Sequence, residues 1–168
     1  MSIRRSFLVI LFLTVASCAD STAPRMPDTF ATSAGGGHRV VGSGHVQGAA
    51  GLREFTFHAA ERPHGGVGGS YKVVLASGLF FEADVTCLAV DGSTGWVAGV
   101  IRATNADAGL LGTRTMFYAI DGGEGEGTTD IVSIAVVNAA PGTDLAFCAD
   151  RPLELAPMAV TDGNVQVR

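Results

Sequence analysis

The chain has 168 residues, a formal net charge of −5 at pH 7 and only 16% charged residues. The excess of acid argues against nucleic-acid binding, which requires a basic surface, and against electrostatic docking to anionic lipid. Nearly half of the residues are hydrophobic, which argues against a disordered chain, and the length suits one folded domain.

Residues 1–17 have the features of an export signal. Two arginines precede ten apolar residues (7–16), too few for a bilayer-spanning helix, which needs about twenty. The segment Val15-Ala16-Ser17-Cys18 then resembles the bacterial lipobox, in which an aliphatic residue and two small residues precede a cysteine. The resemblance implies cleavage before Cys18 and acylation of its thiol, which would anchor the protein to a membrane. An ordinary signal cleaved near Ala19 is the alternative.

The residues after Cys18 bear on the location of the protein. In bacteria with an outer membrane, an aspartate directly after the lipidated cysteine often signals retention in the inner membrane. Here Ala19 holds that position, so the resemblance favours the outer membrane, facing the periplasm or the surface. Residues 18–37 are rich in Ser, Thr, Ala, Pro and Gly and predict a flexible tether. Residues 38–168 are expected to form a single β-domain.

From His38 onward, apolar and polar residues alternate with period two, which is typical of β-strands. Glycine-rich turns separate the apolar runs, and no amphipathic helix is predicted. Strands are expected around residues 52–59, 71–75, 79–89, 96–103, 116–120, 132–136 and 165–167. The spacing predicts an all-β fold of eight or nine strands, either an antiparallel β-sandwich or a small closed β-barrel.

Two cysteines remain once lipid takes Cys18. Cys87 and Cys148 form an even pair in an exported chain, which predicts a disulfide between them. Cys87 alternates with Ala83 and Val85, so we expect its side chain to point into the core. Two separate buried thiols are the alternative, and no CxxC or CxxH spacing supports a metal pair.

Several short motifs resemble a group of uncharacterised secreted bacterial proteins over residues 42–148. The motifs are GSGH at 42–45, DVTCLAVDG at 84–92, WVAGV at 96–100 and IDGGEG at 120–125. The resemblance implies an all-β exported domain without assigning an activity. The chain departs from the pattern at Ala119-Ile120, where two valines are usual, and at Thr128-Thr129, where two prolines are usual.

The loop 121–130 carries the densest group of polar residues. Its carboxylates, those of Asp121, Glu124, Glu126 and Asp130, lie among glycines and suggest a calcium site, since calcium takes six to eight oxygen ligands. The spacing is not that of an EF-hand, and a solvated hairpin loop is the alternative. Paired carboxylates also serve hydrolysis of glycosides, but they must then converge across a cleft.

The sequence contains no catalytic constellation such as Gly-x-Ser-x-Gly, and we do not expect an enzyme. We expect a lipid-anchored domain of the cell envelope with a structural or binding role, whose partners are the membrane, through Cys18, and an envelope protein or a small apolar ligand. One alternative is a calycin-like barrel that carries a small apolar ligand. Another is a calcium-binding or hydrolytic site at 121–130. A closed barrel with an apolar cavity would favour the carrier, and a filled sandwich would favour the scaffold.

Overall fold

A computed structural model describes residues 37–49, 51–125 and 127–168. The expected signal (1–17), Cys18 and the tether up to residue 36 lie outside the described residues. None of the helices in the described ranges is both long enough and apolar enough to cross a membrane. The elements are β1 (Arg39–Gly48), β2 (Gly51–Glu61), β3 (Val67–Leu75), β4 (Phe80–Asp91), β5 (Thr94–Thr104), the 3₁₀ turn η1 (Ala108–Leu110), β6 (Arg114–Ile120), β7 (Ile131–Ser133), β8 (Val136–Ala139), α1 (Thr143–Asp150) and β9 (Pro157–Val167).

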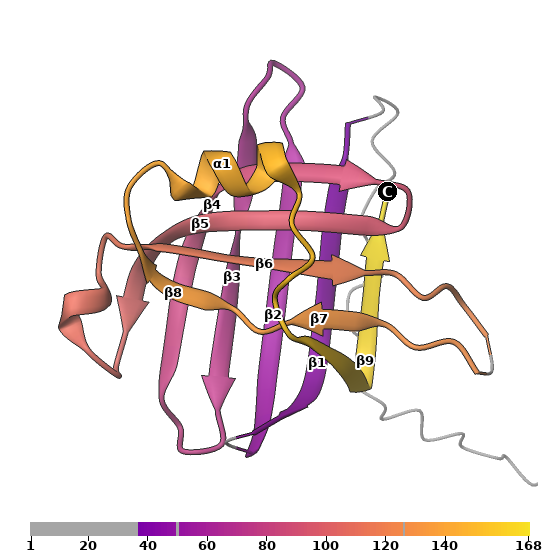
Figure 1. Cartoon of the computed structure of the whole chain (residues 1–168), viewed down its shortest axis with the longest axis horizontal. Coiled ribbons are helices and arrows are strands. Elements are labelled where there is room, and N and C mark those ends of the chain that lie inside the picture. The colour runs from indigo at the N-terminus through magenta and orange to yellow at the C-terminus, as the bar shows by residue number, and fades with distance from the viewer. Residues whose placement is uncertain (1–36, 50, 126) are drawn as a thin grey trace, which may run out of the picture. The chain divides into compact units, whose positions relative to one another are not determined.

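The strands close into an antiparallel barrel, which confirms the all-β fold and decides for a barrel (Figure 1). Eight strands follow one another in the order β5-β4-β3-β2-β1-β9-β7-β6, and β6 pairs back to β5. The ninth strand, β8, pairs with β6 beyond the end of β7. Two backbone hydrogen bonds join Arg39 at the start of β1 to Arg168 at the chain's end. Both ends of the domain therefore lie on neighbouring strands.

The inner core consists of side chains that alternate along the strands, as the period-two pattern predicts. Four aromatic rings dominate it, those of Phe55, Phe57, Tyr71 and Phe117. The rings of Phe57 and Tyr71 lie 5.0 and 4.9 Å from that of Phe117, between centroids. The Tyr71 hydroxyl donates a hydrogen bond to Thr115, and burial raises the pKa of Tyr71 far above its ordinary value. Tyr71 is thus a neutral hydrogen-bond donor inside the barrel.

A β-bulge in β4 reverses the side-chain alternation and changes the expected place of Cys87. Val85 pairs with Gly99 and Cys87 with Ala98, so the register shifts by one residue between them. Ala83 and Val85 face the inner core before the bulge, and Leu88 and Val90 do so after it. The expectation that Cys87 points into the barrel is wrong, because the extra residue turns it to the outer face.

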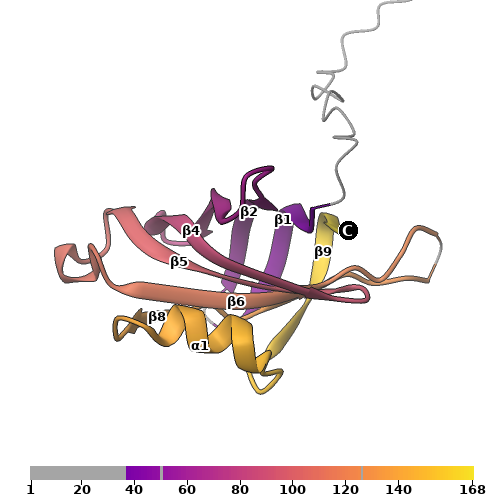
Figure 2. The ribbon, with the colours of Figure 1, turned by 90° about the horizontal axis from the view of Figure 1, so that it is seen from above.

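A second hydrophobic cluster, here called the outer cluster, lies on the outside of the barrel. Its buried members are Cys87, Trp96, Ala98, Met116, Tyr118 and Phe147. Phe147 belongs to α1, which packs on β4, β5 and β6, as Figure 2 shows. Because α1 covers their outer faces, the middle parts of β5 and β6 are buried on both sides. The sequence-based expectation of no helix is therefore wrong for residues 143–150.

Candidate functional site

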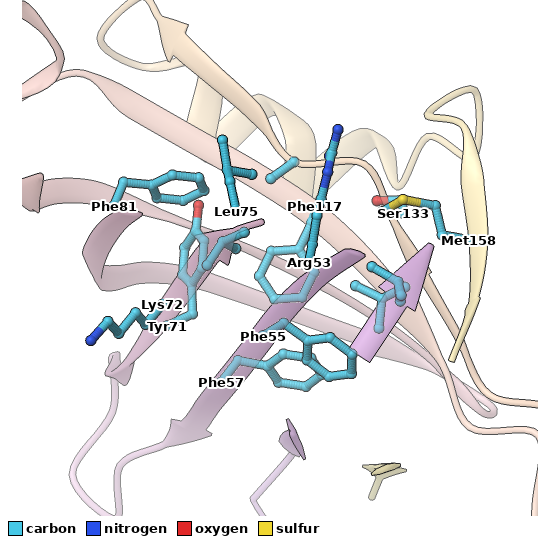
Figure 3. Close-up of a pocket in the computed structure, with 14 residues that line it drawn as sticks. Arg53, Phe55, Phe57, Tyr71, Lys72, Leu75, Phe81, Phe117, Ser133 and Met158 are labelled. Atoms are coloured by element: carbon cyan, nitrogen blue, oxygen red, sulfur yellow. The ribbon is translucent and has the colours of Figure 1, made fainter. Parts of the chain in front are cut away.

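A cavity of about 60 Å³ lies in one end of the barrel (Figure 3). Val46 and Arg53 line it at the turn between β1 and β2, where they pair across the strands. Leu75 and Phe81 line it on either side of the turn between β3 and β4. The cavity therefore occupies the barrel end at which these two hairpins turn.

The wall of the cavity is largely apolar and aromatic. All four rings of the inner core contribute to it, and Val73, Val132 and Met158 contribute from β3, β7 and β9. The only hydroxyl-bearing wall residues among those described are Tyr71 and Ser133. The Tyr71 hydroxyl bonds to Thr115, and that of Ser133 donates to the Ile134 carbonyl and accepts from the Tyr118 amide. Both hydroxyls are thus engaged in hydrogen bonds within the fold.

Arg53 is the charged side chain that faces the inner core, and it does so because it shares the inward alternation of Phe55 and Phe57 on β2. Its Nε is buried and has no hydrogen-bond partner within the described residues. The guanidinium lies against Gly48, where an added Cβ would come within 2.7 Å of Nε. In Figure 3 the Arg53 side chain lies among the apolar side chains, whereas Lys72 points away from them. A cation without an anion thus lines the cavity.

Two of the four predicted calcium ligands in the loop 121–130 have a structural role. The Asp130 carboxylate accepts hydrogen bonds from the amides of Gly122 (2.8 Å) and Val165 (2.6 Å). The Asp121 carboxylate accepts from the amides of Gly123 (2.8 Å) and Val167 (3.1 Å). Beyond the short β7, no strand covers this side of β9 in the described ranges. The two carboxylates therefore take the place of strand partners for β9.

The other two predicted ligands do not complete a metal site in the part of the chain that the structure describes. Glu124 is exposed on the loop, beside a polar hollow of about 190 Å³ that Asp130 and Asn164 also line. Glu126 lies outside the described residues. No three acidic, histidine or cysteine side chains of the described ranges come together as metal ligands. The carboxylates that do come together, Asp121 and Asp130, are engaged with backbone amides.

Replacing Asp130 with asparagine tests its structural role. We expect Asp130→Asn to lower the free energy of unfolding by about 2 kcal/mol, because one of the two backbone amides would face the NH₂ group instead of an acceptor. Urea denaturation followed by circular dichroism measures the effect. Glu124→Gln is the matched control on the same loop and should leave stability unchanged; equal effects of the two substitutions would contradict the assignment.

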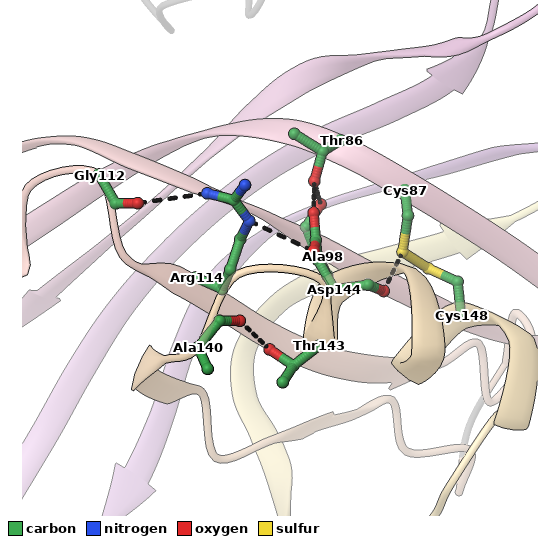
Figure 4. Close-up of polar contacts among 9 residues, drawn as sticks. All are labelled: Thr86, Cys87, Ala98, Gly112, Arg114, Ala140, Thr143, Asp144 and Cys148. Atoms are coloured by element: carbon green, nitrogen blue, oxygen red, sulfur yellow. Dashed lines mark hydrogen bonds and ion pairs between the residues drawn. A yellow bond between two sulfur atoms is a disulfide. The ribbon is translucent and has the colours of Figure 1, made fainter.

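A polar cluster on the outside of the barrel holds α1 in place (Figure 4). Asp144 in the first turn of α1 is buried, and its carboxylate lies 3.2 Å from Arg114 Nε and accepts a 2.7 Å hydrogen bond from the Thr86 hydroxyl. Burial disfavours the ionised carboxylate, but Thr86 and the charge of Arg114 outweigh it, so the pKa of Asp144 lies below its usual value. The cluster is a docking contact that stays ionised at neutral pH.

The remaining predicted site residues are the cysteines. Cys87 and Cys148 form a disulfide with their Cα atoms 6.3 Å apart, and it joins α1 to β4 beside this cluster. Lipidation of Cys18 stays a prediction, because that residue lies outside the described ranges. Comparisons of the chain with protein-family models, with curated proteins and with solved structures find no match.

Sequence reasoning missed Arg53 as a functional residue. The signal was present, since Arg53 occupies an inward position in the same alternation as two phenylalanines. An arginine in an apolar series indicates either a strand end or a buried charge; Arg53 lies near the start of β2 and is half-buried, with its Nε buried.

Proposed function

We propose that the protein is a lipid-anchored β-barrel of the cell envelope that binds a small apolar ligand, or the apolar end of a larger one, in the open end of the barrel. The observation that supports this function most directly is the cavity, which lies inside a closed barrel and has aromatic and aliphatic walls. Apolar cavities with a few polar groups are the usual sites for small ligands.

The size of the cavity limits what it can hold. A water molecule needs about 10–15 Å³ of cavity volume. The cavity of about 60 Å³ therefore has room for about five water-sized groups. This suits a slender chain better than a polycyclic ring system. Each buried methylene contributes about 0.8 kcal/mol, so a short chain already gives useful affinity.

The surroundings of the cavity also favour an apolar ligand. Leu52 directly follows the β1–β2 turn and is 46% exposed, and Leu79 lies in the β3–β4 turn and is 39% exposed. The two turns are neighbours, because a Cβ on Gly51 would lie 3.3 Å from the Ala76 side chain. Neither leucine lines the cavity, but both add exposed apolar surface to the barrel end at which it lies.

Binding of straight-chain alcohols tests the proposal. We expect affinity measured by titration calorimetry to rise about fourfold per added methylene, from butanol upward, until the chain fills the cavity, and then to level off. The variant Ala135→Leu places extra atoms into the wall and should weaken binding of the longer alcohols at least tenfold. Val137→Leu, at an exposed position two residues on, is the matched control.

Two results would overturn the proposal. One is the absence of alcohol binding at any chain length. The other is binding that Ala135→Leu leaves unchanged, because the ligand would then lie elsewhere. The anchor is tested separately by the mass of the N-terminal peptide from the native host, which should be that of an acylated cysteine and should change in Cys18→Ala.

A further inference from the structure

We propose that the ligand is an anionic amphiphile, a monocarboxylate with a slender apolar chain, and that Arg53 binds its carboxylate. The inference rests on the proposed function and adds the chemistry of the ligand's head group. It is carried by the location of one cation: Arg53 lines an apolar cavity, and its Nε is buried without an acceptor.

A comparison within the chain shows what Arg53 lacks. Arg114 is the second described arginine whose Nε is buried without a regular hydrogen bond, but its charge is balanced by the Asp144 carboxylate 3.2 Å away. The structure gives no ion pair for Arg53 among residues 37–49, 51–125 and 127–168. A buried donor without an acceptor is unfavourable, and more so when it is charged. A bound anion would supply that acceptor.

The neighbouring charged groups are engaged elsewhere. Glu54 is exposed on the opposite face of β2 from Arg53. The carboxylates of Glu82 and Asp84 on β4 pair with Arg102. The Lys72 ammonium lies 5.1 Å from the centre of the Phe80 ring and points away from the cavity. Within the described part of the chain, Arg53 is thus the cation that a ligand in the cavity would meet.

The geometry favours a head group at the mouth and a chain inside. Arg53 pairs with Val46 next to the β1–β2 turn, whereas Phe55 and Phe57 follow on the same face of β2, deeper in the barrel. Gly48 leaves the space that the guanidinium occupies. An anion at Arg53 would therefore direct its chain past Phe55 toward the ring of Phe117.

The charge balance favours a single negative charge. One guanidinium offers a planar pair of donors that matches a carboxylate. The chain as a whole carries a net charge of −5, and Lys72, the other cation among the described lining residues, points away from the cavity, so a multiply charged head group is disfavoured. A monocarboxylate has the planar pair of acceptor oxygens and the single charge that this site favours, and its apolar chain suits the apolar wall of the cavity.

Paired ligands of equal chain length test the inference. At pH 7 we expect the wild-type protein to bind hexanoate at least tenfold more tightly than hexanol, and more tightly than hexyl phosphate. Arg53→Met keeps the apolar stem and removes the charge, so it should abolish the preference for hexanoate while hexanol still binds. Gly48→Ala displaces the guanidinium without touching its charge and should weaken hexanoate binding more than hexanol binding. Arg62→Met removes an exposed arginine from the β2–β3 turn and is the control of equal net charge.

The outcomes separate the inference from the proposed function. Equal binding of hexanol and hexanoate by the wild type would overturn the head-group assignment and leave the apolar site intact. A preference for hexanoate that survives in Arg53→Met would overturn the role of Arg53, and tighter binding of hexyl phosphate would overturn the monocarboxylate. Failure of all three ligands to bind would overturn the proposed function itself.

Discussion

Replacing both Cys87 and Cys148 with alanine is expected to lower the free energy of unfolding by about 4 kcal/mol. The disulfide links residues 61 positions apart, and opening a loop of that size restores a large amount of conformational freedom to the unfolded chain. The disulfide also joins an element that has few other contacts, since Asp144 and Phe147 are the only buried residues of α1. Chemical denaturation of the variant and of the reduced wild type measures the loss, and the two should agree.

Trp96 provides a local readout of the same change. It is the only tryptophan in the chain, it lies in the outer cluster, and its Nε1 donates a 2.9 Å hydrogen bond to the Pro152 carbonyl just after α1. If the disulfide holds α1 in place, the double variant should show a red-shifted Trp96 emission at denaturant concentrations where the barrel's circular dichroism is unchanged. Coincident transitions at the wild-type midpoint would contradict this role of the disulfide.

Asp144→Asn is expected to lower the free energy of unfolding by about 3 kcal/mol at pH 7, because it leaves the partly buried Arg114 without its counter-charge. The amide oxygen can still accept the Thr86 hydrogen bond, so the loss reports mainly on the ion pair. Asp150→Asn, at the exposed end of the same helix, is the matched control and should have little effect. Urea denaturation of the three proteins under identical conditions gives the comparison.

The pH dependence of the same pair gives an independent check. The pKa of Asp144 is lowered in the folded state, so its contribution to stability is complete above the unfolded-state pKa of about 4 and is lost as pH falls through the folded-state value. The difference in stability between wild type and Asp144→Asn should therefore be large at pH 7 and shrink steadily below pH 4. A difference that is constant down to the acid limit would show that Asp144 does not act through its charge.

The sequence predicted most of the strands, because the barrel wall imposes a strict alternation of inward and outward residues. This alternation is visible in the sequence of β2, at Phe55 and Phe57, and in that of β3, at Tyr71 and Val73. The sequence delimited no strand at β1 and only the last three residues of β9. The helix α1 was missed because it spans eight residues of which two are buried, which is too short for a helical period to stand out. β8 continues the line of β7 after a break, and the sequence shows only one apolar run there.

The choice between a sandwich and a barrel depends on pairings between distant residues, which local patterns do not contain. Closure requires β9 to reach both β1 and β7, and β6 to return to β5. The inward orientation of Cys87 was wrong for a related reason, since one inserted residue in β4 inverts every later position in the alternation. The pairing of Cys87 with Cys148 could still be predicted, because it follows from the number of cysteines and the expected export signal.

The candidate site was only partly accessible from the sequence. The composition of the acidic loop predicted a calcium site, but Asp121 and Asp130 accept hydrogen bonds from the amides of Val167 and Val165 in β9, 46 and 35 residues further along the chain. The cavity arises from side chains of seven strands, and no single segment indicates it. The place of Arg53 in the cavity wall likewise depends on how these strands are arranged around it.

The position of β9 has a consequence for the order of events during synthesis. A ribosome delivers the chain from its N-terminus, and β1 leaves it long before residues 160–167 of β9, which will pair with β1. Until then one edge of β1 has no partner, and the sheet remains an open ribbon whose apolar face is accessible to other chains. A chain that lacks β9 would keep this edge of β1 unpaired, so we expect the removal of β9 to promote association with other chains.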